Sequence, residues 1–395
     1  MNKILVINAG SSSIKWTLFN KNLHIEAKGV AERIKMDMGK LTLNYQESKI
    51  EKDIFLPSFL ETVKQLVELW EEHGIIHDYS DISKVAFRVV NGGPKLQSTT
   101  YVNEQTIDWL KESIDLAPVH NPGALEAIIA FKELFTNATM SMHFDTSFHN
   151  TLPKVSYTYP INSDLAKELN IRKYGFHGLN YHYITEKCQE LFNKQKINVV
   201  IMHIGNGASL CAVEDSKSID TSMGFTPLAG IMMGTRSGDI DASIIPYIIK
   251  HKGFTVDEIF KILNEKSGML GVSNVSSDVR DVQKAKKENL RAAFALDLYT
   301  QRIADYLITY INKIKNKLDA IVFTAGVGEN DHLVREQVIK KINLINLKVD
   351  ESKNKGRDFG DYKIISSDDS VIPIYVIRAE EEMFIAKEAI TMKQN

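Results

Sequence analysis

The sequence predicts an α/β protein built from two related halves. Two segments, at residues 4–15 and 199–213, share one plan: an apolar strand, a turn of small residues, and a second apolar strand. Asn8 in the first segment and Asn206 in the second lie half the chain apart. Strands and helices alternate in both halves, which is typical of α/β proteins with partly parallel sheets. We therefore expect a duplicated domain.

Composition supports two globular domains and argues against several functional classes. A chain of 395 residues exceeds one ordinary hydrophobic core, and 44% hydrophobic with 25% charged residues is typical of a globular protein. The formal net charge of −2 provides no basic surface, so we expect neither nucleic acid nor membrane as a partner. Cys188 and Cys211 lack metal-ligand spacing and favour a reducing compartment. The N-terminus lacks the apolar segment of a signal peptide, so we expect a cytoplasmic protein.

In the first half, a capping-box pattern at Ser58 and Glu61 predicts the start of an amphipathic helix. An apolar run at 85–90 predicts a buried strand. A helix is expected from Asn-Pro at 121–122 as far as residue 134, followed by a short strand at 141–144.

In the second half, a long helix is expected before a buried strand at 320–324. A glycine turn expected at 325–330 would lie at the carboxyl edge of the sheet, where phosphate or ribose binds. A last strand at 371–377 precedes a terminal helix, and any boundary between the halves is a tight crossover near residue 150. The long helix is expected to present one apolar stripe, with an irregularity near Ile303, made of Leu290, Phe294, Leu298, Leu307, Ile311 and Ile314.

The first turn has the composition of a phosphate-binding turn. Small residues let the backbone approach an anion closely, and successive backbone N–H groups converge on it. Ser11 and Ser13 add hydroxyl donors, and Lys15 adds a positive charge. The alternative is that both turns belong to ordinary β-hairpins.

Several polar residues stand at strand ends or in turns. Arg88 lies within an apolar strand, where it needs either a buried ion-pair partner or a ligand. Asp145 follows a strand and is either an N-cap or a site residue. His177 lies between an aromatic residue and a glycine. Arg236 belongs to a segment, 220–239, with little secondary-structure signal, and so long a loop is usually functional.

The same residues belong to motifs that follow one another in a definite order. They are Asn-Ala-Gly-Ser-Ser-Ser-Ile-Lys at 8–15, Arg-Val-Val-Asn-Gly-Gly at 88–93, Ala-Pro-Val-His-Asn-Pro at 117–122, Phe-Asp-Thr-Ser-Phe-His at 144–149, Tyr-Gly-Phe-His-Gly at 174–178, His-Ile-Gly-Asn-Gly-Ala-Ser at 203–209 and Met-Gly-Thr-Arg-Ser-Gly-Asp-Ile-Asp at 233–241. In this order they resemble the acetate kinase family over residues 8–382. That family belongs to the sugar kinase, Hsp70 and actin superfamily, which agrees with the repeat of the two halves.

The resemblance implies duplicated actin-like ATPase domains, of ribonuclease H-like fold, with a central cleft. The N-terminal domain would comprise residues 1–148 and 382–395. The C-terminal domain, 149–381, would bind the nucleotide and form the interface of a homodimer. The implied reaction is reversible, in-line transfer of a phosphoryl group from ATP to acetate, giving acetyl phosphate and ADP. It would depend on Mg²⁺, with Mn²⁺ as an alternative metal.

This reaction brings two anions together, so positioning and charge neutralisation are the main tasks. By resemblance, Arg88 binds the acetate carboxylate, and Arg236 with His177 contacts the transferring phosphoryl group. Asp145 matches the residue usually described as the family's catalytic acid or base. Because acetate is already ionised near neutral pH, we expect Asp145 to order Mg²⁺ waters or an arginine instead.

The resemblance also implies the binding residues. Asn8 and Glu381, the latter flanked by Glu380 and Glu382, are the expected metal ligands, because Mg²⁺ prefers hard oxygen ligands and keeps several waters. The acetyl methyl group is expected in a small apolar pocket of Val90, Val119, Phe176 and Pro227. The residues expected to contact the nucleotide are Ser11, Ser13, Lys15, His203, Ile204, Gly205, Asn206, Gly207, Asp278, Val279, Arg280, Gly326, Val327, Gly328, Glu329 and Asn330.

The sequence departs from the family pattern beside these positions. The family usually has His at the places of Phe87 and Asn91, Thr-Ser-His at 179–181, and Pro-Thr-Asn at 378–380. These changes spare the named site residues but bear on rate, pH profile and substrate preference.

Two alternatives to an ATP-dependent acetate kinase stay open. One keeps the enzyme but changes the acid to propionate or butyrate, because a small apolar pocket discriminates one methylene by only about 1–3 kcal/mol, or changes the donor to pyrophosphate. The glycine-rich segment 326–330 favours a nucleotide over pyrophosphate. The other is a nucleotide-binding protein of the same fold without catalysis, against which the complete set of site residues argues.

Overall fold

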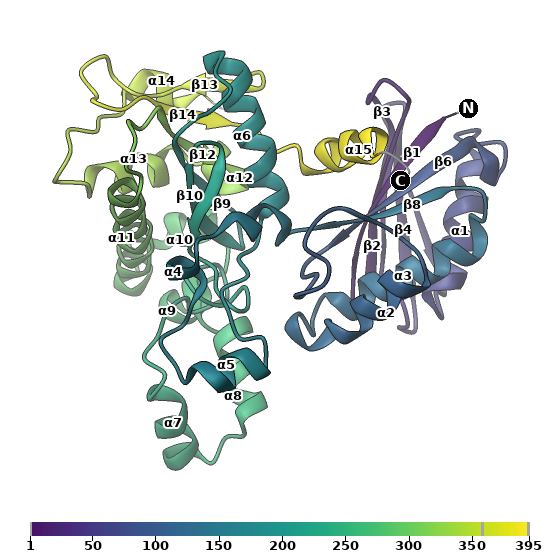
Figure 1. The fold of residues 1–395 in the computed structure, drawn as a ribbon, viewed down its shortest axis with the longest axis horizontal. Coiled ribbons are helices and arrows are strands. Elements are labelled where there is room, and N and C mark those ends of the chain that lie inside the picture. The colour runs from purple at the N-terminus through teal and green to yellow at the C-terminus, as the bar shows by residue number, and fades with distance from the viewer. Residues whose placement is uncertain (1, 357–358, 393–395) are drawn as a thin grey trace. The chain divides into compact units, whose positions relative to one another are not determined.

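The computed structural model describes residues 2–356 and 359–392, and the chain divides into two compact units. Met1–Phe148 and Glu380–Asn395 make up the first unit, and His149–Ala379 make up the second. Each unit contains one mixed β-sheet with helices packed on it (Figure 1).

The sheet of the first unit begins with the predicted hairpin, in which β1 and β2 pair antiparallel. On its other edge β1 pairs in parallel with β6, and β6 pairs in parallel with β8. The strand order is β5-β4-β3-β2-β1-β6-β8-β7. The bounds are β1 (Lys3–Gly10), β2 (Ser13–Phe19), β3 (Ile25–Glu32), β4 (Gly39–Tyr45), β5 (Ser48–Ile54), β6 (Ile82–Val89), β7 (Thr100–Tyr101) and β8 (Thr139–Phe144).

One face of this sheet forms the core with two helices. Trp16 of β2 meets Trp70 edge-to-face at 4.9 Å, and Phe87 of β6 meets Phe131 in the same way at 5.7 Å. Ser58 caps the helix that carries Trp70, α1, because its hydroxyl accepts a hydrogen bond from the N–H of Glu61, as predicted. The helices of the unit are α1 (Phe59–Glu72), α2 (Glu104–Glu112), α3 (Asn121–Leu134) and α15 (Glu381–Thr391), with short 3₁₀ turns at Tyr79–Asp81, Ile114–Leu116 and Ser147–Thr151 at its end.

The terminal helix α15 covers the opposite face of the sheet. Thr17 of β2 donates to the Glu382 carboxylate at 2.7 Å, and His143 of β8 lies 2.8 Å from the Glu388 carboxylate. Because strand side chains alternate between faces, Arg88 points to the α15 side while its neighbour Phe87 points into the core. The departure from the family pattern at Phe87 is therefore a core substitution.

The second unit repeats the strand plan of the first. Its hairpin strands β9 and β10 pair antiparallel, and β9 pairs in parallel with β12, as β1 does with β6. The strand order is β11-β10-β9-β12-β14-β13. The bounds are β9 (Val199–Ile204), β10 (Ala208–Glu214), β11 (Lys217–Thr221), β12 (Ala320–Thr324), β13 (Tyr362–Ile364) and β14 (Ile374–Ile377). The duplication predicted from the two hairpins is confirmed.

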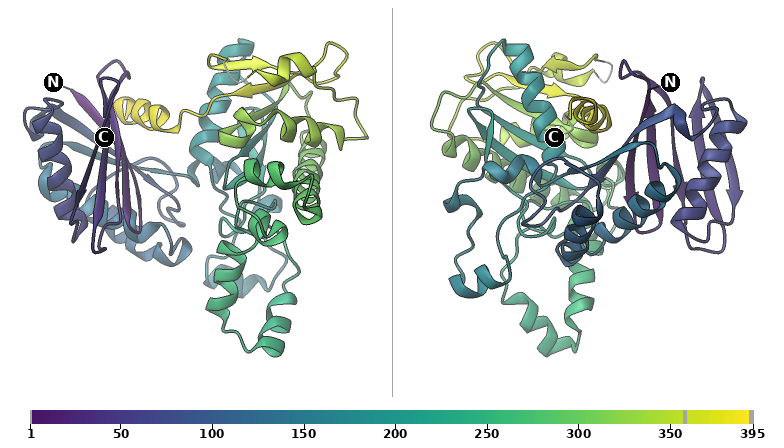
Figure 2. Two further views of the ribbon diagram at one scale, coloured as in Figure 1. Left: turned by 180° about the vertical axis from the view of Figure 1, so that it is seen from behind. Right: turned by 45° about the vertical axis from the view of Figure 1, so that its right-hand side comes forward.

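The helices of the second unit flank this sheet and extend to one end of the unit, where α5, α7 and α8 lie (Figure 1, Figure 2). Their bounds are α4 (Lys154–Tyr157), α5 (Ser163–Glu168), α6 (Gly178–Phe192), α7 (Ile244–Lys252), α8 (Val256–Glu265), α9 (Gly268–Ser273), α10 (Val279–Ala285), α11 (Leu290–Lys313), α12 (Ala325–Asn330), α13 (His332–Lys340) and α14 (Glu351–Lys355). Within the described ranges, no helix is long and apolar enough to cross a membrane.

Two local predictions are wrong. The expected glycine turn at 325–330 is the short helix α12, whose carbonyls at Gly328 and Glu329 accept hydrogen bonds from the buried Arg335 guanidinium. The apolar stripe expected on α11 is also misplaced, because Leu290 and Phe294 are exposed. The buried stripe of that helix instead contains Ala292, Ala295, Tyr299, Ile303, Ala304, Leu307 and Tyr310.

Candidate active site

In the first unit, the predicted residues Arg88 and Asp145 form a bidentate ion pair. Arg88 donates from Nε and Nη2 to the two carboxylate oxygens of Asp145, at 2.9 and 2.7 Å. Asp145 follows β8, the neighbour of β6, and its backbone N–H donates to the carbonyl of Val89, which fixes its position. The Asp145 side chain is almost fully buried and that of Arg88 is 21% exposed. The two hydrogen bonds therefore hold one edge of the guanidinium and fix the orientation of its plane.

Glu381, the first residue of α15, lies on the free side of this guanidinium. Its carboxylate is 3.7 Å from Arg88 Nη1, which makes no hydrogen bond among the described residues. Burial tends to lower the pKa of Arg88, but the charges of Asp145 and Glu381 outweigh it and raise the pKa above its ordinary value. Asn8 and Lys15 are aligned with Arg88 across β1 and β2, so they share its face of the sheet.

The β1–β2 turn, which carries Ser11, lies against the first turn of α3. A Cβ added to Gly123 would come within 2.1 Å of the Gly10 carbonyl oxygen, so the close approach depends on glycine. Asn91, a departure from the family pattern, helps to hold the start of the same helix. The Asn121 amide donates to the Asn91 carbonyl at 2.8 Å, and its oxygen accepts from the Asn91 N–H.

In the second unit, His177 and His203 stack face to face. Their ring centroids are 3.9 Å apart and the planes differ by 11°. His177 caps α6 in the left-handed conformation, with φ of 58°, and its Nδ1 lies 2.7 Å from the Ser209 hydroxyl. His203 is the penultimate residue of β9, beside the second hairpin turn, and its Nδ1 lies 2.8 Å from the Asn180 amide nitrogen.

Arg236 approaches the same hairpin turn. Its Nη1 donates to the Pro227 carbonyl at 3.1 Å, and burial lowers its pKa. A Cβ added to Gly207 would lie 3.5 Å from Arg236 Nη1 and 3.7 Å from His177 Nε2. The predicted loop at 220–239 is irregular after β11, as expected, and it presents Arg236 to the turn. Thus a cation and an imidazole face one bare glycine, which is a suitable setting for an anion.

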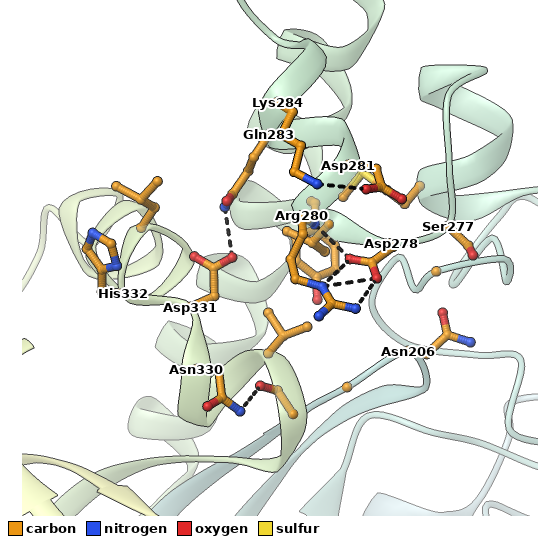
Figure 3. Close-up of a pocket in the computed structure, with 18 residues that line it drawn as sticks. Asn206, Ser277, Asp278, Arg280, Asp281, Gln283, Lys284, Asn330, Asp331 and His332 are labelled. Atoms are coloured by element: carbon orange, nitrogen blue, oxygen red, sulfur yellow. Dashed lines mark hydrogen bonds and ion pairs between the residues drawn. The ribbon is translucent and has the colours of Figure 1, made fainter. Parts of the chain in front are cut away.

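A cavity of about 1130 Å³ opens beside this turn, large enough for a nucleotide. Most of the predicted nucleotide segments meet there (Figure 3). Arg280 folds back onto Asp278, and Gln283 donates to Asp331 across the cavity wall at 2.9 Å. The predicted residues that line it are Gly205, Asn206, Asp278, Val279, Arg280, Gly326, Val327 and Asn330.

Other lining residues were not predicted. Ser277, Gln283 and His332 extend predicted motifs by a few positions, so a wider window would have included them. Met269 and Tyr299 come from α9 and α11, and no local sequence signal marks them. His203, Ile204, Gly207, Gly328 and Glu329 were predicted but do not line the cavity, while Ser11, Ser13 and Lys15 belong to the first unit.

Arg335 and Asn354, both about 1% exposed, support the wall of the cavity without lining it. Arg335 donates to the Asn354 side-chain oxygen and to its backbone carbonyl, each at 2.7 Å. Asn354 Nδ2 donates in turn to the carbonyl of His332, which lines the cavity. The two residues therefore fix the corner between α12 and α13.

The four residues predicted to contact the acetyl methyl group belong to different units. Val90 and Val119 lie in the first unit, and Val119 is 58% exposed. Phe176 is buried and Pro227 half-buried, both in the second unit. Among the residues that the structure describes, no cluster of three or more His, Cys, Asp or Glu side chains forms a ready metal site.

A duplicated fold with a nucleotide-sized cavity and cationic side chains beside a glycine turn defines a phosphoryl-transfer enzyme. The sequence profile of the Acetokinase family matches residues 3–387, and the chain belongs to this family. An acetate kinase of Mycoplasmopsis pulmonis is 51% identical over 98% of this chain and 98% of its own length.

Solved structures agree with this assignment. The crystal structure of Porphyromonas gingivalis acetate kinase matches with a TM-score of 0.93 at 33% identity, over 99% of each chain. The crystal structure of a propionate kinase from Francisella tularensis also matches with a TM-score of 0.93, at 37% identity over 100% of each chain. The chain is thus a kinase whose family phosphorylates carboxylates.

Proposed function

We propose that this chain transfers the terminal phosphoryl group of ATP to acetate, reversibly, giving acetyl phosphate and ADP. The observation that carries the proposal is the Arg88 guanidinium, which Asp145 holds by Nε and Nη2, while Nη1 makes no hydrogen bond among the described residues and lies 3.7 Å from Glu381. A planar guanidinium so oriented suits a carboxylate. The family membership and the nucleotide-sized cavity support ATP as the donor.

The transfer forms a bond between a carboxylate oxygen and the γ-phosphorus and breaks the bond between that phosphorus and the β–γ bridging oxygen. The bond electrons leave with ADP. The charge spreads over the three equatorial oxygens in the transition state. Arg236 and His177, which face the Gly207 turn together, are proposed to stabilise this charge.

Asp145 is proposed to act through Arg88 rather than as a base. Acetate has no proton to lose near neutral pH, since carboxyl groups ionise near pH 4. Both Asp145 oxygens already accept hydrogen bonds from Arg88. This supports the second of the two roles expected from the sequence, the ordering of an arginine.

We propose Asn8 and Glu381 as the residues that hold Mg²⁺, with Mn²⁺ as an alternative. Both lie near Arg88 on one face of the sheet and offer oxygen donors, and Mg²⁺ needs few protein ligands because it keeps several waters. When bound, the metal would neutralise charge on the phosphate chain. Ser11, Ser13 and Lys15 in the adjacent turn are proposed phosphate contacts.

Propionate is the proposed second substrate. The acetyl pocket of Val90, Val119, Phe176 and Pro227 is apolar, and such a pocket rejects one extra methylene by only about 1–3 kcal/mol. The similarity to a propionate kinase structure favours this reading. Comparing kcat/KM for acetate, propionate and butyrate would rank the acids.

We further propose a cytoplasmic homodimer formed through the second unit. Large apolar side chains are exposed on α7 and α8, including Tyr247 and Val256, each 63% exposed. Val155 on α4 is also exposed, at 87%. Both cysteines are buried free thiols, which agrees with a reducing compartment. Sedimentation of the full chain would determine its oligomeric state.

A hydroxamate assay tests the proposed function. With acetate, ATP and Mg²⁺, the chain should form acyl phosphate that hydroxylamine traps. Replacing ATP by pyrophosphate should abolish the product. A chain that formed no acyl phosphate from any short-chain acid would instead be a nucleotide-binding protein without catalysis.

A further inference from the structure

We propose that Asn180 and Tyr181 are positioning residues that set the hydrogen-bonding roles of the stacked His203 and His177. In this arrangement the ring proton of His203 is on Nε2, and the Nε2 atoms of both rings lie near the Gly205–Gly207 turn. The kinetic part of this inference rests on the proposed function, whereas its structural part does not.

The first contact is between Asn180 and His203. Asn180, on α6, is fully buried, and its side-chain nitrogen Nδ2 lies 2.8 Å from His203 Nδ1. An amide NH₂ group can only donate, so His203 Nδ1 accepts and carries no proton. The ring proton is therefore on Nε2, and His203 is held neutral.

The second contact links Tyr181 to His177 through Ser209. The Tyr181 hydroxyl lies 2.5 Å from the Ser209 hydroxyl, which lies 2.7 Å from His177 Nδ1. Tyr181 and Ser209 are both fully buried. A serine hydroxyl both donates and accepts, so it can serve His177 Nδ1 in either protonation state. In each case His177 Nδ1 is occupied, and Nε2 is the atom turned outward.

Both outward nitrogens lie at the same glycine turn. A Cβ added to Gly207 would be 3.7 Å from His177 Nε2, and one added to Gly205 would be 4.0 Å from His203 Nε2. The rings are stacked at 3.9 Å, so two positive charges there would repel each other. If His203 is neutral, His177 can carry a positive charge beside Arg236 without repulsion from a second charged ring stacked on it. His149, which packs on Tyr181 at 5.7 Å, is a further titratable group near the network.

Asn180 and Tyr181 stand at two of the positions where this sequence differs from the pattern that the resemblance implies. If Asn180 and Tyr181 served only to fill the core, other buried residues of similar size could replace them. The proposal instead requires a particular protonated nitrogen on His203.

The direct test is ¹⁵N NMR of the full chain labelled at the histidine rings. His177→Gln and His203→Gln spectra would assign the two signals. We expect the pattern of a neutral ring protonated at Nε2 for His203 at neutral pH, and its loss in the isosteric Asn180→Asp variant. A wild-type His203 protonated at Nδ1, or at both nitrogens, would overturn the proposal without recourse to any variant. An unchanged signal in a folded Asn180→Asp protein would also overturn it.

Kinetics provide the second readout. Tyr181→Phe removes the hydroxyl bound to Ser209, so kcat should fall by about fivefold, the effect of one hydrogen bond. The KM for ATP should change less than twofold. The control is Tyr310→Phe, the same change at another buried tyrosine, whose hydroxyl has no partner among the described residues. An equal effect of both variants on kcat would contradict the role of Tyr181. A wild-type chain that made no acyl phosphate would refute the proposed function, and the NMR comparison would still decide the positioning.

Discussion

Arg88 and Asp145 are 57 positions apart in the chain, yet they form a bidentate ion pair with hydrogen bonds of 2.9 and 2.7 Å. The parallel pairing of β6 with β8 brings them together, because Arg88 stands at the end of one strand and Asp145 just beyond the other. The pair fixes the plane of a guanidinium that is partly exposed on the α15 side of the sheet.

Asp145→Asn should impair acetate use more than ATP binding. An asparagine offers one acceptor oxygen, so Arg88 would lose half of its bidentate hold and an opposite charge. We expect kcat to fall by about 100-fold, which corresponds to about 2.7 kcal/mol at 1.36 kcal/mol per factor of ten. The KM for acetate should rise, while the dissociation constant of ATP should change less than twofold.

Arg88→Ala should show the same pattern, with a higher acetate KM and a lower kcat. Asp108→Asn, in an exposed ion pair with Lys111, is the matched control and should leave both constants unchanged. A variant of Arg88 that altered only the affinity for ATP would show that the carboxylate is bound elsewhere.

Gly207→Ala should weaken nucleotide binding without unfolding the protein. The added methyl group would lie 3.5 Å from Arg236 Nη1, an ordinary contact, so the fold can accept it. It would occupy the space that both Arg236 and His177 face. Equilibrium binding of ADP should weaken about tenfold or more, which corresponds to ~1.4 kcal/mol. Unaltered ADP affinity, with an unchanged melting temperature, would place the phosphates away from this turn.

Asn354→Ala should raise the KM for ATP although Asn354 does not line the cavity. Its loss leaves the Arg335 guanidinium without its Nε partner and frees the carbonyl of His332. A buried unpaired group costs about 1–3 kcal/mol, so some loss of stability is also expected. The acetate KM should stay within twofold of wild type. Arg302→Gln, at an exposed arginine of α11, serves as the control. Equal increases in both KM values would indicate general loosening rather than a local effect on the nucleotide wall.

Glu329→Gln should stabilise the protein at alkaline pH. Burial raises the pKa of Glu329 above its ordinary value, although the N–H of Ala379 donates to its carboxylate at 2.9 Å. A raised pKa means that the folded state favours the protonated form. The stability this provides is complete below the ordinary glutamate pKa, about 4.3, and is lost as pH rises through the raised value.

A neutral glutamine should therefore raise the apparent melting temperature by about 1–3 °C near pH 8. The gain should shrink toward pH 5, and differential scanning calorimetry at the two pH values would measure it. A gain that grew toward acid pH would show that the Glu329 carboxylate is stabilised as an anion.

Local patterns predicted much of the fold. The two strand–turn–strand segments predicted the duplication, because small-residue turns and apolar flanking strands can be recognised from neighbouring residues alone. Ser58 and Glu61 marked a helix start for the same reason. The helix at Ala325–Asn330 was missed because its glycines indicate a turn, whereas Arg335 of the next helix stabilises its carboxyl end. The stripe on α11 was misplaced because alanine and tyrosine, not the large aliphatic residues, face the core.

The candidate site was predictable where one motif contains it and unpredictable where several elements meet. Arg88 raised two possibilities, an ion pair or a ligand, and the structure shows the ion pair with Asp145, while Glu381 lies 3.7 Å from the remaining nitrogen, Nη1. Tyr299 and Met269 reach the cavity from separate helices, so only tertiary packing reveals them. The roles of Asn180 and Tyr181 likewise depend on His203 and Ser209, which are 23 and 28 positions further along the chain.

The transfer of phosphorus to a carboxylate oxygen can be measured with acetate labelled by ¹⁸O in both oxygens. ³¹P NMR of the product, formed with ATP and Mg²⁺, reports any ¹⁸O bonded to phosphorus through its isotope shift. We expect acetyl phosphate with one ¹⁸O on phosphorus, and a smaller amount of the same labelled product from Arg88→Ala at the same acetate concentration. Product without ¹⁸O on phosphorus, or no acyl phosphate at all, would contradict it.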